Sequence, residues 1–273
     1  MSRIDKAIEK AAQLRDVTPL PVAPPKVEPS VRVEPPRRGR MERLLEVEPL
    51  PVDNPFLVAS GKALPAVAEE YKKLKSMVIR LTKGKQFKNS LVVTSTVAAE
   101  GKSLTALNLA TTLAQEYDHT VLLVDADLRK PSIHKLLGLQ PQVGLVHCLK
   151  GDASLEDALV KTGIGKLVVL PAGGVVSDPV ELLSSNRMKQ IIKELKARYP
   201  ERYVIIDTPP VLPFAEAQVL ASQADGVLFV IREGCAKASH VKEALETVKG
   251  VNLLGVVYND SSVRQKKGSY YYY

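Results

Sequence analysis

From Ser90 onward, short apolar runs alternate with longer segments in which apolar residues recur at helical spacing. This alternation is typical of a parallel sheet that helices bury on both faces. The pattern therefore predicts an α/β fold with a doubly wound, mostly parallel sheet flanked by helices, and with its ligand site at the carboxyl ends of the strands. The predicted strands cover 91–95, 120–127, 166–172, 203–209, 226–232 and 253–259, and the predicted helices lie near 102–116, 132–137, 154–160, 179–197, 215–222 and 237–248.

Residues 1–60 lack this alternation, and ten of the chain's nineteen prolines lie there. Such a proline density prevents packed helices and sheets. Apolar residues between Ile4 and Leu14 form one helical stripe, which predicts a short amphipathic helix, with a docking role and no fixed role both left open. We predict a short helix and a largely disordered Pro-rich linker over 1–60, a folded domain over 61–263 that opens with a helix at 65–83, and a flexible tyrosine-cluster tail over 264–273.

The net charge of +8 does not predict a specific nucleic-acid partner. The excess lies in residues 61–90, where eight Lys/Arg accompany two Asp/Glu without interleaved aromatic residues for base stacking. Cys148 and Cys235 stand far apart without a His at ligand spacing, a pattern that suggests neither a disulfide framework nor a zinc site. No secretion signal and no apolar run of about 18 residues is present, so we expect a cytoplasmic protein.

The first predicted strand leads into TSTVAAEGKSLTALNLA, where Gly101, Lys102 and Ser103 open a helix. A helix amino end offers free N–H groups and a positive dipole end to a phosphate. Lysine adds charge near the β and γ phosphates, and serine can ligate Mg²⁺. The usual first glycine of the G-x-x-x-x-G-K-[ST] pattern is Thr96 here, so this motif alone indicates a nucleotide site only weakly.

Acidic residues follow two further predicted strands. Asp125 and Asp127 stand in LLVDADLRKP, and Asp207 stands in YVIIDTPP. Since parallel strands bring their carboxyl ends to one edge, we expect these three carboxylates to converge on the phosphate loop. Buried carboxylates need a cation or donors, and Mg²⁺ with nucleotide phosphates supplies a cation. The alternative is that these three acids are helix caps or turn residues that merely face water.

With these motifs in this order, the chain resembles the bacterial P-loop tyrosine kinases (BY-kinases). That family has a variant Walker A loop, a Walker A-prime motif (here VDADLRKP), a Walker B strand (here VIIDTPP) and a C-terminal tyrosine cluster (here YYYY). The resemblance covers roughly residues 64–273. It implies an ATP-dependent protein-tyrosine autokinase that regulates exopolysaccharide synthesis and export, of the subgroup whose membrane activator is a separate polypeptide.

The resemblance also implies roles for the site residues. Lys102 would neutralise the transferring phosphate of ATP, Asp125 would be the base toward tyrosine, and the reverse assignment of Asp125 and Asp127 stays open. Mg²⁺ would bind Ser103, Asp127 and Asp207, so the catalytic set is Lys102, Asp125, Asp127 and Asp207. The nucleotide-binding segment is Ala98, Ala99, Glu100, Gly101, Lys102, Ser103 and Leu104.

Two segments depart from the family pattern. Ala98 and Ala99 replace Pro-Gly, and alanine adopts left-handed angles less freely than glycine, which predicts weaker nucleotide binding. The E-x-x-R-x-x-R oligomerisation motif is EEYKKLK, with Glu69, Lys72 and Lys75. Because lysine lacks the guanidinium fork, the interface is expected to be weaker. A solvated helix face with i,i+3 charge pairs is the alternative interpretation.

Acceptors and partners follow from the same resemblance. The expected acceptors are Tyr270, Tyr271, Tyr272 and Tyr273, phosphorylated in trans within a homo-oligomer. The expected partners are a membrane-bound activator of the chain-length-determinant type, which would recruit the chain to the inner face of the membrane, and a tyrosine phosphatase.

Two other functions fit the sequence less well. A partitioning or MinD-like ATPase switch would carry a signature lysine where this chain has Val97, and a nucleotide-binding scaffold would not need all of the acids retained here. For Arg129 and Lys130, binding of phosphate, contact with a neighbouring subunit and simple solvation all stay open.

Overall fold

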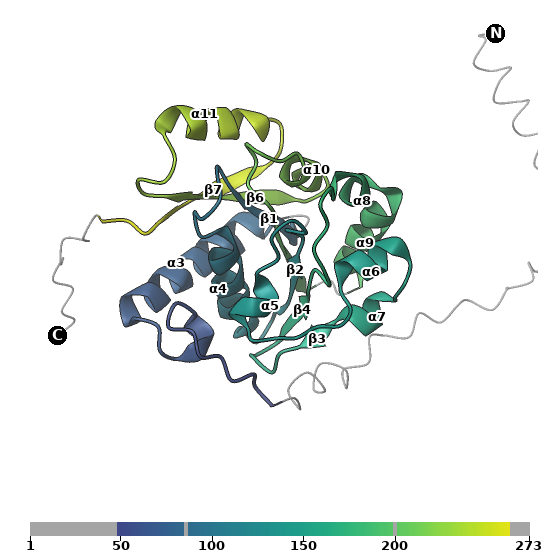
Figure 1. Ribbon diagram of the computed structural model, residues 1–273. Helices are drawn as coiled ribbons and strands as arrows, with labels where there is room; N and C mark the ends of the chain where they lie inside the picture. The colour runs from purple at the N-terminus through teal and green to yellow at the C-terminus, as the bar shows by residue number, and fades with distance from the viewer. Residues whose placement is uncertain (1–47, 85–86, 199–200, 263–273) are drawn as a thin grey trace, which may run out of the picture. The chain divides into compact units, whose positions relative to one another are not determined.

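The computed structural model describes residues 48–84, 87–198 and 201–262, so the predicted N-terminal helix and the tyrosine tail lie outside it. The described residues form a seven-stranded sheet of order β3-β4-β2-β5-β1-β6-β7, with helices on both faces (Figure 1). All neighbouring strands pair in parallel except β3 and β4. The strands are β1 (Ser90–Ser95), β2 (Thr120–Asp125), β3 (Val160–Lys161), β4 (Leu167–Leu170), β5 (Arg202–Asp207), β6 (Gly226–Arg232) and β7 (Leu253–Asn259).

Alternate residues of each strand pack into different cores, as the period of two along a strand requires. Leu91 and Val93 of β1 join the core on one face, while Val92 joins the core on the other. Every residue of β1, β2, β4 and β5 is buried, which explains why their sequences read as continuous apolar runs. The predicted doubly wound α/β fold is therefore confirmed.

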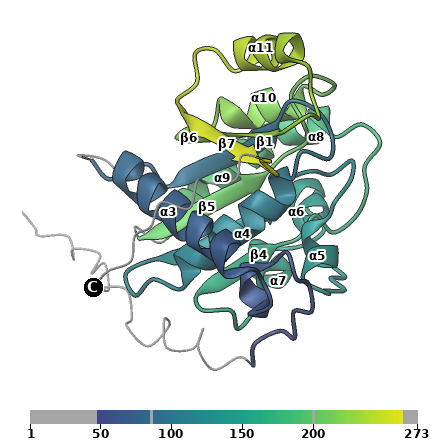
Figure 2. The ribbon, with the colours of Figure 1, turned by 90° about the vertical axis from the view of Figure 1, so that its left-hand side faces the viewer.

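Helices close each face of the sheet. The first face is covered by α3, α4 and α5, whose apolar residues share one core, and Figure 2 shows α3 and α4 lying over the central strands. The second face is covered by α6 to α10 around a separate core, and α11 packs near β6 and α10. The described helices are η1 (Val58–Ser60), α3 (Pro65–Thr82), α4 (Lys102–Ala114), α5 (Ile133–Leu136), α6 (Leu145–Lys150), α7 (Leu155–Ala158), α8 (Val180–Ser184), α9 (Asn186–Ala197), α10 (Glu216–Ala221) and α11 (Ala238–Thr247).

Three elements differ from the predicted ones. The single helix predicted at 179–197 is two helices, because Ser185 has extended backbone angles and its Oγ accepts a hydrogen bond from Met188 N at 3.2 Å, which caps α9. Helix α6 has six residues and strand β3 has two. Strand β3 is too short to show a period of two, and the sequence pattern predicted neither element.

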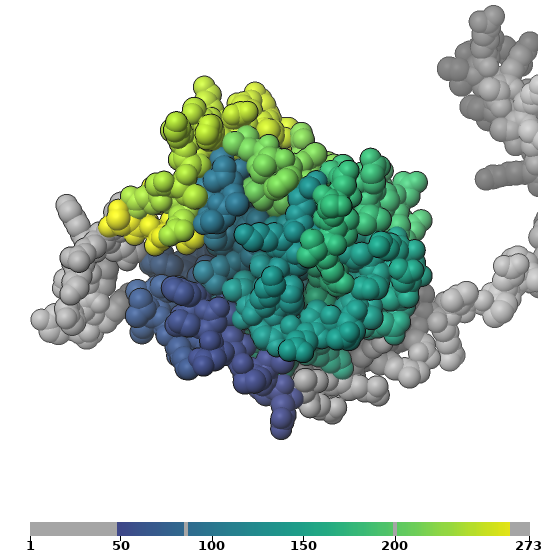
Figure 3. All heavy atoms as spheres, in the orientation of Figure 1, coloured from purple at the N-terminus to yellow at the C-terminus, as the bar shows by residue number. Residues whose placement is uncertain are grey.

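The folded domain begins earlier than the predicted boundary at residue 61. Leu57 is fully buried in the α4-side core, and Val58 N donates to Asn108 Oδ1 of α4 at 2.9 Å. Leu50 N donates to Thr162 O at 3.0 Å. Figure 3 shows this stretch, the darkest purple, lying against the body of the domain. Leu50, Leu57 and Val58 therefore contact the folded domain although they lie in the predicted linker, because a proline-rich segment can still pack as an extended strap when it carries apolar side chains.

No helix within the described ranges is long and apolar enough to cross a bilayer.

Candidate active site

The segment between β1 and α4 forms the predicted phosphate loop at the carboxyl end of β1. Gly101 caps α4 with φ 88°, and Lys102 is the first residue of the helix. Ala99 adopts φ 66°, in the left-handed region that the family pattern reserves for glycine. For alanine this conformation costs about 1–2 kcal/mol. The loop nevertheless has the shape in which the free N–H groups of α4 point toward a phosphate.

Glu100 braces this loop from inside. Its side chain is fully buried: Oε2 accepts from Val97 N at 2.8 Å and Oε1 from Arg232 N at 3.4 Å. Asn259 Nδ2, at the end of β7, donates to the Glu100 carbonyl at 2.9 Å. The expected nucleotide contact of Glu100 is thus restricted to its backbone, because its carboxylate is engaged within the loop.

Gly101 is required at its position by this same arrangement. A Cβ added there would lie 2.2 Å from Asn259 Nδ2, and its φ of 88° is unfavourable for other residues. The phosphate loop is therefore fitted against the ends of β6 and β7.

Lys102 stands at the centre of the predicted acidic cluster. Its Nζ lies 2.7 Å from Asp127 Oδ2, 3.1 Å from Ser103 Oγ and 3.9 Å from Asp207 Oδ1. Burial by itself lowers the pKa of Lys102, but the charges of Asp207 and Asp127 outweigh burial and leave the pKa above its ordinary value. The ammonium group is therefore charged and held in place before any nucleotide arrives.

Asp125 and Asp207 lie opposite each other in the β2–β5 pairing. Asp125 Oδ2 accepts from Ser132 N at 3.1 Å and Ile133 N at 3.0 Å, while its Oδ1 has no hydrogen-bond partner among the described residues. Burial, then the charge of Asp207, raises the pKa of Asp125 to about 7, against the opposing effect of those two N–H groups. Asp125 thus holds the loop that follows β2 and keeps one oxygen free.

Asp207 is the least satisfied of the three acids. It is fully buried, and within the described part of the chain neither carboxylate oxygen accepts a hydrogen bond. Burial raises its pKa to about 6, although Lys102 and the nearby Ser103 hydroxyl act in the opposite direction. An orphaned buried carboxylate next to a phosphate loop is the environment that suits a bound cation. The predicted convergence of Lys102, Ser103, Asp125, Asp127 and Asp207 is observed.

Within the described residues, no group of three or more His, Cys, Asp or Glu is arranged to hold a metal ion. Mg²⁺ commonly uses one or two protein carboxylates together with nucleotide phosphates and water. Asp127 is partly engaged already, because its Oδ1 accepts from Lys130 N at 3.0 Å.

The Arg129 side chain is 27% exposed, and its hydrogen bonds are to residues outside the phosphate loop. Its Nε donates to Glu216 Oε1 at 2.7 Å, and its Nη1 donates to the Ser177 carbonyl at 2.7 Å. Its guanidinium also stacks 4.5 Å from the centre of the Phe214 ring. Arg129 therefore joins the loops that follow β2, β4 and β5, which are three neighbouring strands.

The sequence missed the supporting residues Arg232, Asn259 and Glu216. Each is a polar residue near the end of a strand or the start of a helix, and each acts through a contact more than 80 positions away in the chain. Arg232 and Asn259 carried a usable signal, since each is the polar residue that ends an apolar run, GVLFVIR and LLGVVYN respectively.

The predicted oligomerisation stripe lies on α3. Lys72 Nζ pairs with Glu69 Oε2 at 3.2 Å on the exposed face, as an i,i+3 pair. Lys75 instead pairs with Glu116 of the same chain, near the end of α4. The stripe is thus partly engaged within the chain, and the four acceptor tyrosines lie outside the described residues.

Comparison with known proteins identifies the family. Residues 92–255 match the model of the AAA domain family. Tyrosine-protein kinase YwqD of Bacillus subtilis is 40% identical over 209 residues, covering 76% of this chain and 86% of the relative. The kinase domain of Escherichia coli tyrosine kinase ETK superposes with a TM-score of 0.69 at 29% identity, covering 80% of this chain and 86% of that one. The septum site-determining protein MinD of Pyrococcus horikoshii, solved with Mg-ADP, reaches a TM-score of 0.54 at 25% identity over 65% of this chain and 72% of its own. The chain belongs to the family of bacterial P-loop tyrosine kinases.

Proposed function

We propose that this chain transfers the γ-phosphoryl group of ATP to tyrosine and that its own tail supplies the main acceptors. The observation that carries the proposal is the buried Lys102 ammonium, held 2.7 Å from Asp127 and 3.9 Å from Asp207 at the amino end of α4. Similarity to kinases such as YwqD supports the choice of tyrosine as the acceptor. In phosphoryl transfer, positioning and charge neutralisation provide most of the catalysis.

The chain's own groups would bind and orient the nucleotide. The N–H groups at the start of α4 would hold the phosphates, with Lys102 as the fixed counter-charge. To reach the β and γ phosphates, the Lys102 ammonium has to exchange part of its contact with Asp127. Glu100 keeps the loop in shape during this exchange, because its carboxylate contacts are internal to the protein.

Ser103, Asp127 and Asp207 would hold Mg²⁺, and the unpaired oxygens of Asp207 support this assignment. When bound, Mg²⁺ would neutralise charge on the transferring phosphates. Asp125 would accept the proton of the tyrosine hydroxyl through its free Oδ1, while Oδ2 stays fixed by two backbone N–H groups. Asp125 and Asp127, the two carboxylates of the Walker A-prime motif, would then have separate roles.

Asn259, which contacts Glu100 of the phosphate loop, lies three residues before Ser262, the last residue that the structure describes. We propose that Tyr270 to Tyr273 enter the site of a neighbouring copy in a homo-oligomer that uses the α3 stripe. Each transfer adds about −1.5 to −2 charge, so phosphorylated tails would repel one another and loosen the oligomer.

The wider setting is part of the same proposal. A separate membrane-bound activator would recruit the chain to the inner face of the membrane, a tyrosine phosphatase would reset the tail, and the cycle would regulate exopolysaccharide synthesis. The MinD-like switch is disfavoured because Val97 stands at the signature-lysine position.

The test is to replace Tyr270 to Tyr273 with Phe in the full chain and to measure phosphotyrosine by mass spectrometry after incubation with ATP and Mg²⁺. Most autophosphorylation should be lost, while nucleotide binding stays unchanged. Tyr117→Phe, at a side chain that is 92% exposed, is the matched control and should label like the wild type. Undiminished phosphotyrosine in the fourfold variant would overturn the assignment of the tail as acceptor.

A further inference from the structure

A groove opens beside α9 at the end of the sheet opposite to Lys102. It has a volume of about 520 Å³, within the range of small-ligand pockets. Asn89, one of its lining residues, directly precedes β1, whereas the phosphate loop follows β1. The groove is therefore separate from the candidate active site, and its ligand can be inferred independently of the proposed function.

Three lysines of α9 line this groove. Lys189, Lys193 and Lys196 stand at i, i+4 and i+7, the spacing that brings side chains to one face of a helix. Lys196 Nζ is neutralised by Asp225 Oδ1 at 2.6 Å. Lys189 and Lys193 are exposed and form no ion pair within the described ranges. Two positive charges along one wall thus have no ion-pair partner among the residues that the structure describes.

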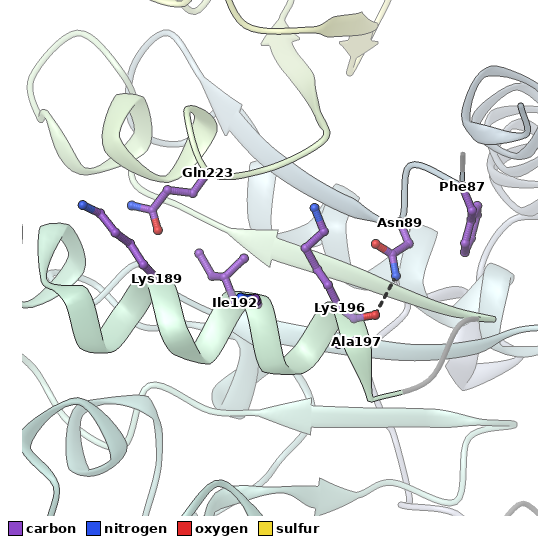
Figure 4. A pocket seen from close by; sticks show the side chains of 8 residues that line it. Phe87, Asn89, Lys189, Ile192, Lys196, Ala197 and Gln223 are labelled. Atoms are coloured by element: carbon purple, nitrogen blue, oxygen red, sulfur yellow. Dashed lines mark hydrogen bonds between the residues drawn. The ribbon is translucent and has the colours of Figure 1, made fainter. Parts of the chain in front are cut away.

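An unsatisfied amide lies at the same end as Lys189. Gln223 donates from Nε2 to Val219 O at 3.3 Å, but its buried Oε1 has no hydrogen-bond partner among the described residues. Figure 4 shows Gln223 and Lys189 facing the same space. A buried amide oxygen without a partner is costly, so this end of the groove carries a polar group that the described residues leave unsatisfied.

The other end of the groove is apolar. Figure 4 places Phe87 there, beyond Asn89 and Lys196. The Phe87 ring is fixed edge-on to Tyr203, with ring centres 4.9 Å apart. Ile192, between the two ends, belongs to the buried core and gives the floor an apolar surface. The groove therefore offers charge at one end and an aromatic contact at the other.

We propose that this groove binds a phosphate monoester that has an apolar or aromatic body. A phosphate monoester carries about −1.5 to −2 charge at neutral pH, which matches the two unpaired lysines. From Lys189 to Ala197 the helix rises about 12 Å, which is longer than a free phosphate needs. A phosphotyrosine of a second copy and a small phosphorylated metabolite share this chemistry.

The experiment is a titration of the full-length, ¹⁵N-labelled protein with phenyl phosphate, followed at the backbone amides of α9 by NMR. Those signals report on the groove and not on the phosphate loop. They should shift and saturate with phenyl phosphate, and phenol should leave them unchanged. The double variant Lys189→Ala, Lys193→Ala should raise the Kd at least about tenfold. Lys150→Ala combined with Lys242→Ala removes the same charge from exposed positions elsewhere and should leave the Kd unchanged.

Two further ligands distinguish the two possible sources of the phosphate monoester, a phosphotyrosine of a second copy and a small metabolite. A peptide of the Tyr270–Tyr273 sequence carrying phosphotyrosine would identify the tail as the source if it binds more tightly than phenyl phosphate, and equal binding would point to a small phosphate ester. The proposal is overturned if α9 signals do not respond to phenyl phosphate, if both double variants bind alike, or if an unphosphorylated tetraglutamate peptide binds equally well.

Discussion

The two ends of this parallel sheet carry lysines in opposite situations. At the carboxyl end, the Lys102 side chain is only 12% exposed and is surrounded by carboxylates. At the amino end, Lys189 and Lys193 extend from α9 into solvent, and among the three α9 lysines of the groove only Lys196 has an acidic partner within the described part of the chain. The same residue type is thus fixed in one region and free in the other.

The difference shows how burial decides what a charge can do. A buried charge has to be paired, so Lys102 is held with Asp127 and Asp207 at a fixed position, ready for the phosphates. Exposed lysines keep their rotamer freedom and their hydration, so they provide attraction without precise geometry. The carboxyl end is built for chemistry, and the amino end is suited at most to binding.

Removing Lys102, the fixed lysine, should have the largest effect on activity. Lys102→Met should reduce phosphotyrosine formation by about 10³-fold, because the β and γ phosphates lose their fixed counter-charge and Asp207 is left buried and unpaired. Quantitative mass spectrometry with Mg-ATP measures this loss. Lys189→Met should leave the rate unchanged, and equal activity of the two variants would show that Lys102 does not belong to the reaction site.

The next largest effect should separate the two acids of the Walker A-prime motif. Asp125→Asn and Asp127→Asn should each reduce phosphoryl transfer by about 10²–10³-fold with the fold intact, as judged by circular dichroism. Only Asp127→Asn should raise the Mg²⁺ concentration needed for half-maximal activity. Identical Mg²⁺ titrations for both variants and the wild type would contradict the division of roles.

The carboxyl end should make stability depend on pH through Asp125 and Asp207. Because the pKa values of Asp125 and Asp207 are raised in the folded state, the folded protein retains protons that the unfolded chain loses near pH 4. The free energy of unfolding of the nucleotide-free protein should therefore fall as pH rises from about 4 to about 7. Asp207→Asn should reduce this loss by roughly 1–3 kcal/mol, measured by urea denaturation at several pH values. Lys189→Ala should leave the slope unchanged, and a wild-type profile that is flat over this range would refute the expectation.

The smallest effect concerns the strained alanine of the phosphate loop. Ala99→Gly should raise the free energy of unfolding by a few tenths to about 1 kcal/mol, because glycine adopts φ 66° without steric cost but loses more entropy on folding. Ala98→Gly is the matched control: Ala98 is not at positive φ, so the same change should lower stability. Thermal denaturation of both variants provides the measurement, and equal shifts would exclude strain at Ala99.

The parts that the sequence predicted are those with a local signal. The strands ending at Asp125 and Asp207 read as apolar runs followed by an acid, so their convergence on Lys102 could be expected from sheet geometry alone. The left-handed position of Ala99 could be anticipated from the family pattern.

The missed features depend on distant contacts. Glu100 looked like a loop residue that faces the ligand, but its carboxylate turns inward because the N–H groups of Val97 and Arg232 are there to donate. Leu57 lies in a proline-rich stretch, and only the three-dimensional position of α4 gives it a buried place. Contacts between residues far apart in the sequence recur at no period and no fixed spacing, so they cannot be predicted from the sequence pattern.

Arg129 ties the loops at the edge of the site together. A single guanidinium is hydrogen-bonded to Glu216 and to the Ser177 carbonyl, so it spans segments that come from three separate strands. A displacement of any one of these loops should therefore move the other two, because all three are bonded to the same guanidinium group. Entry of a nucleotide next to Asp127, two residues before Arg129, would then also displace the loops that follow β4 and β5. The site should open and close as one piece, with a single relaxation time instead of three.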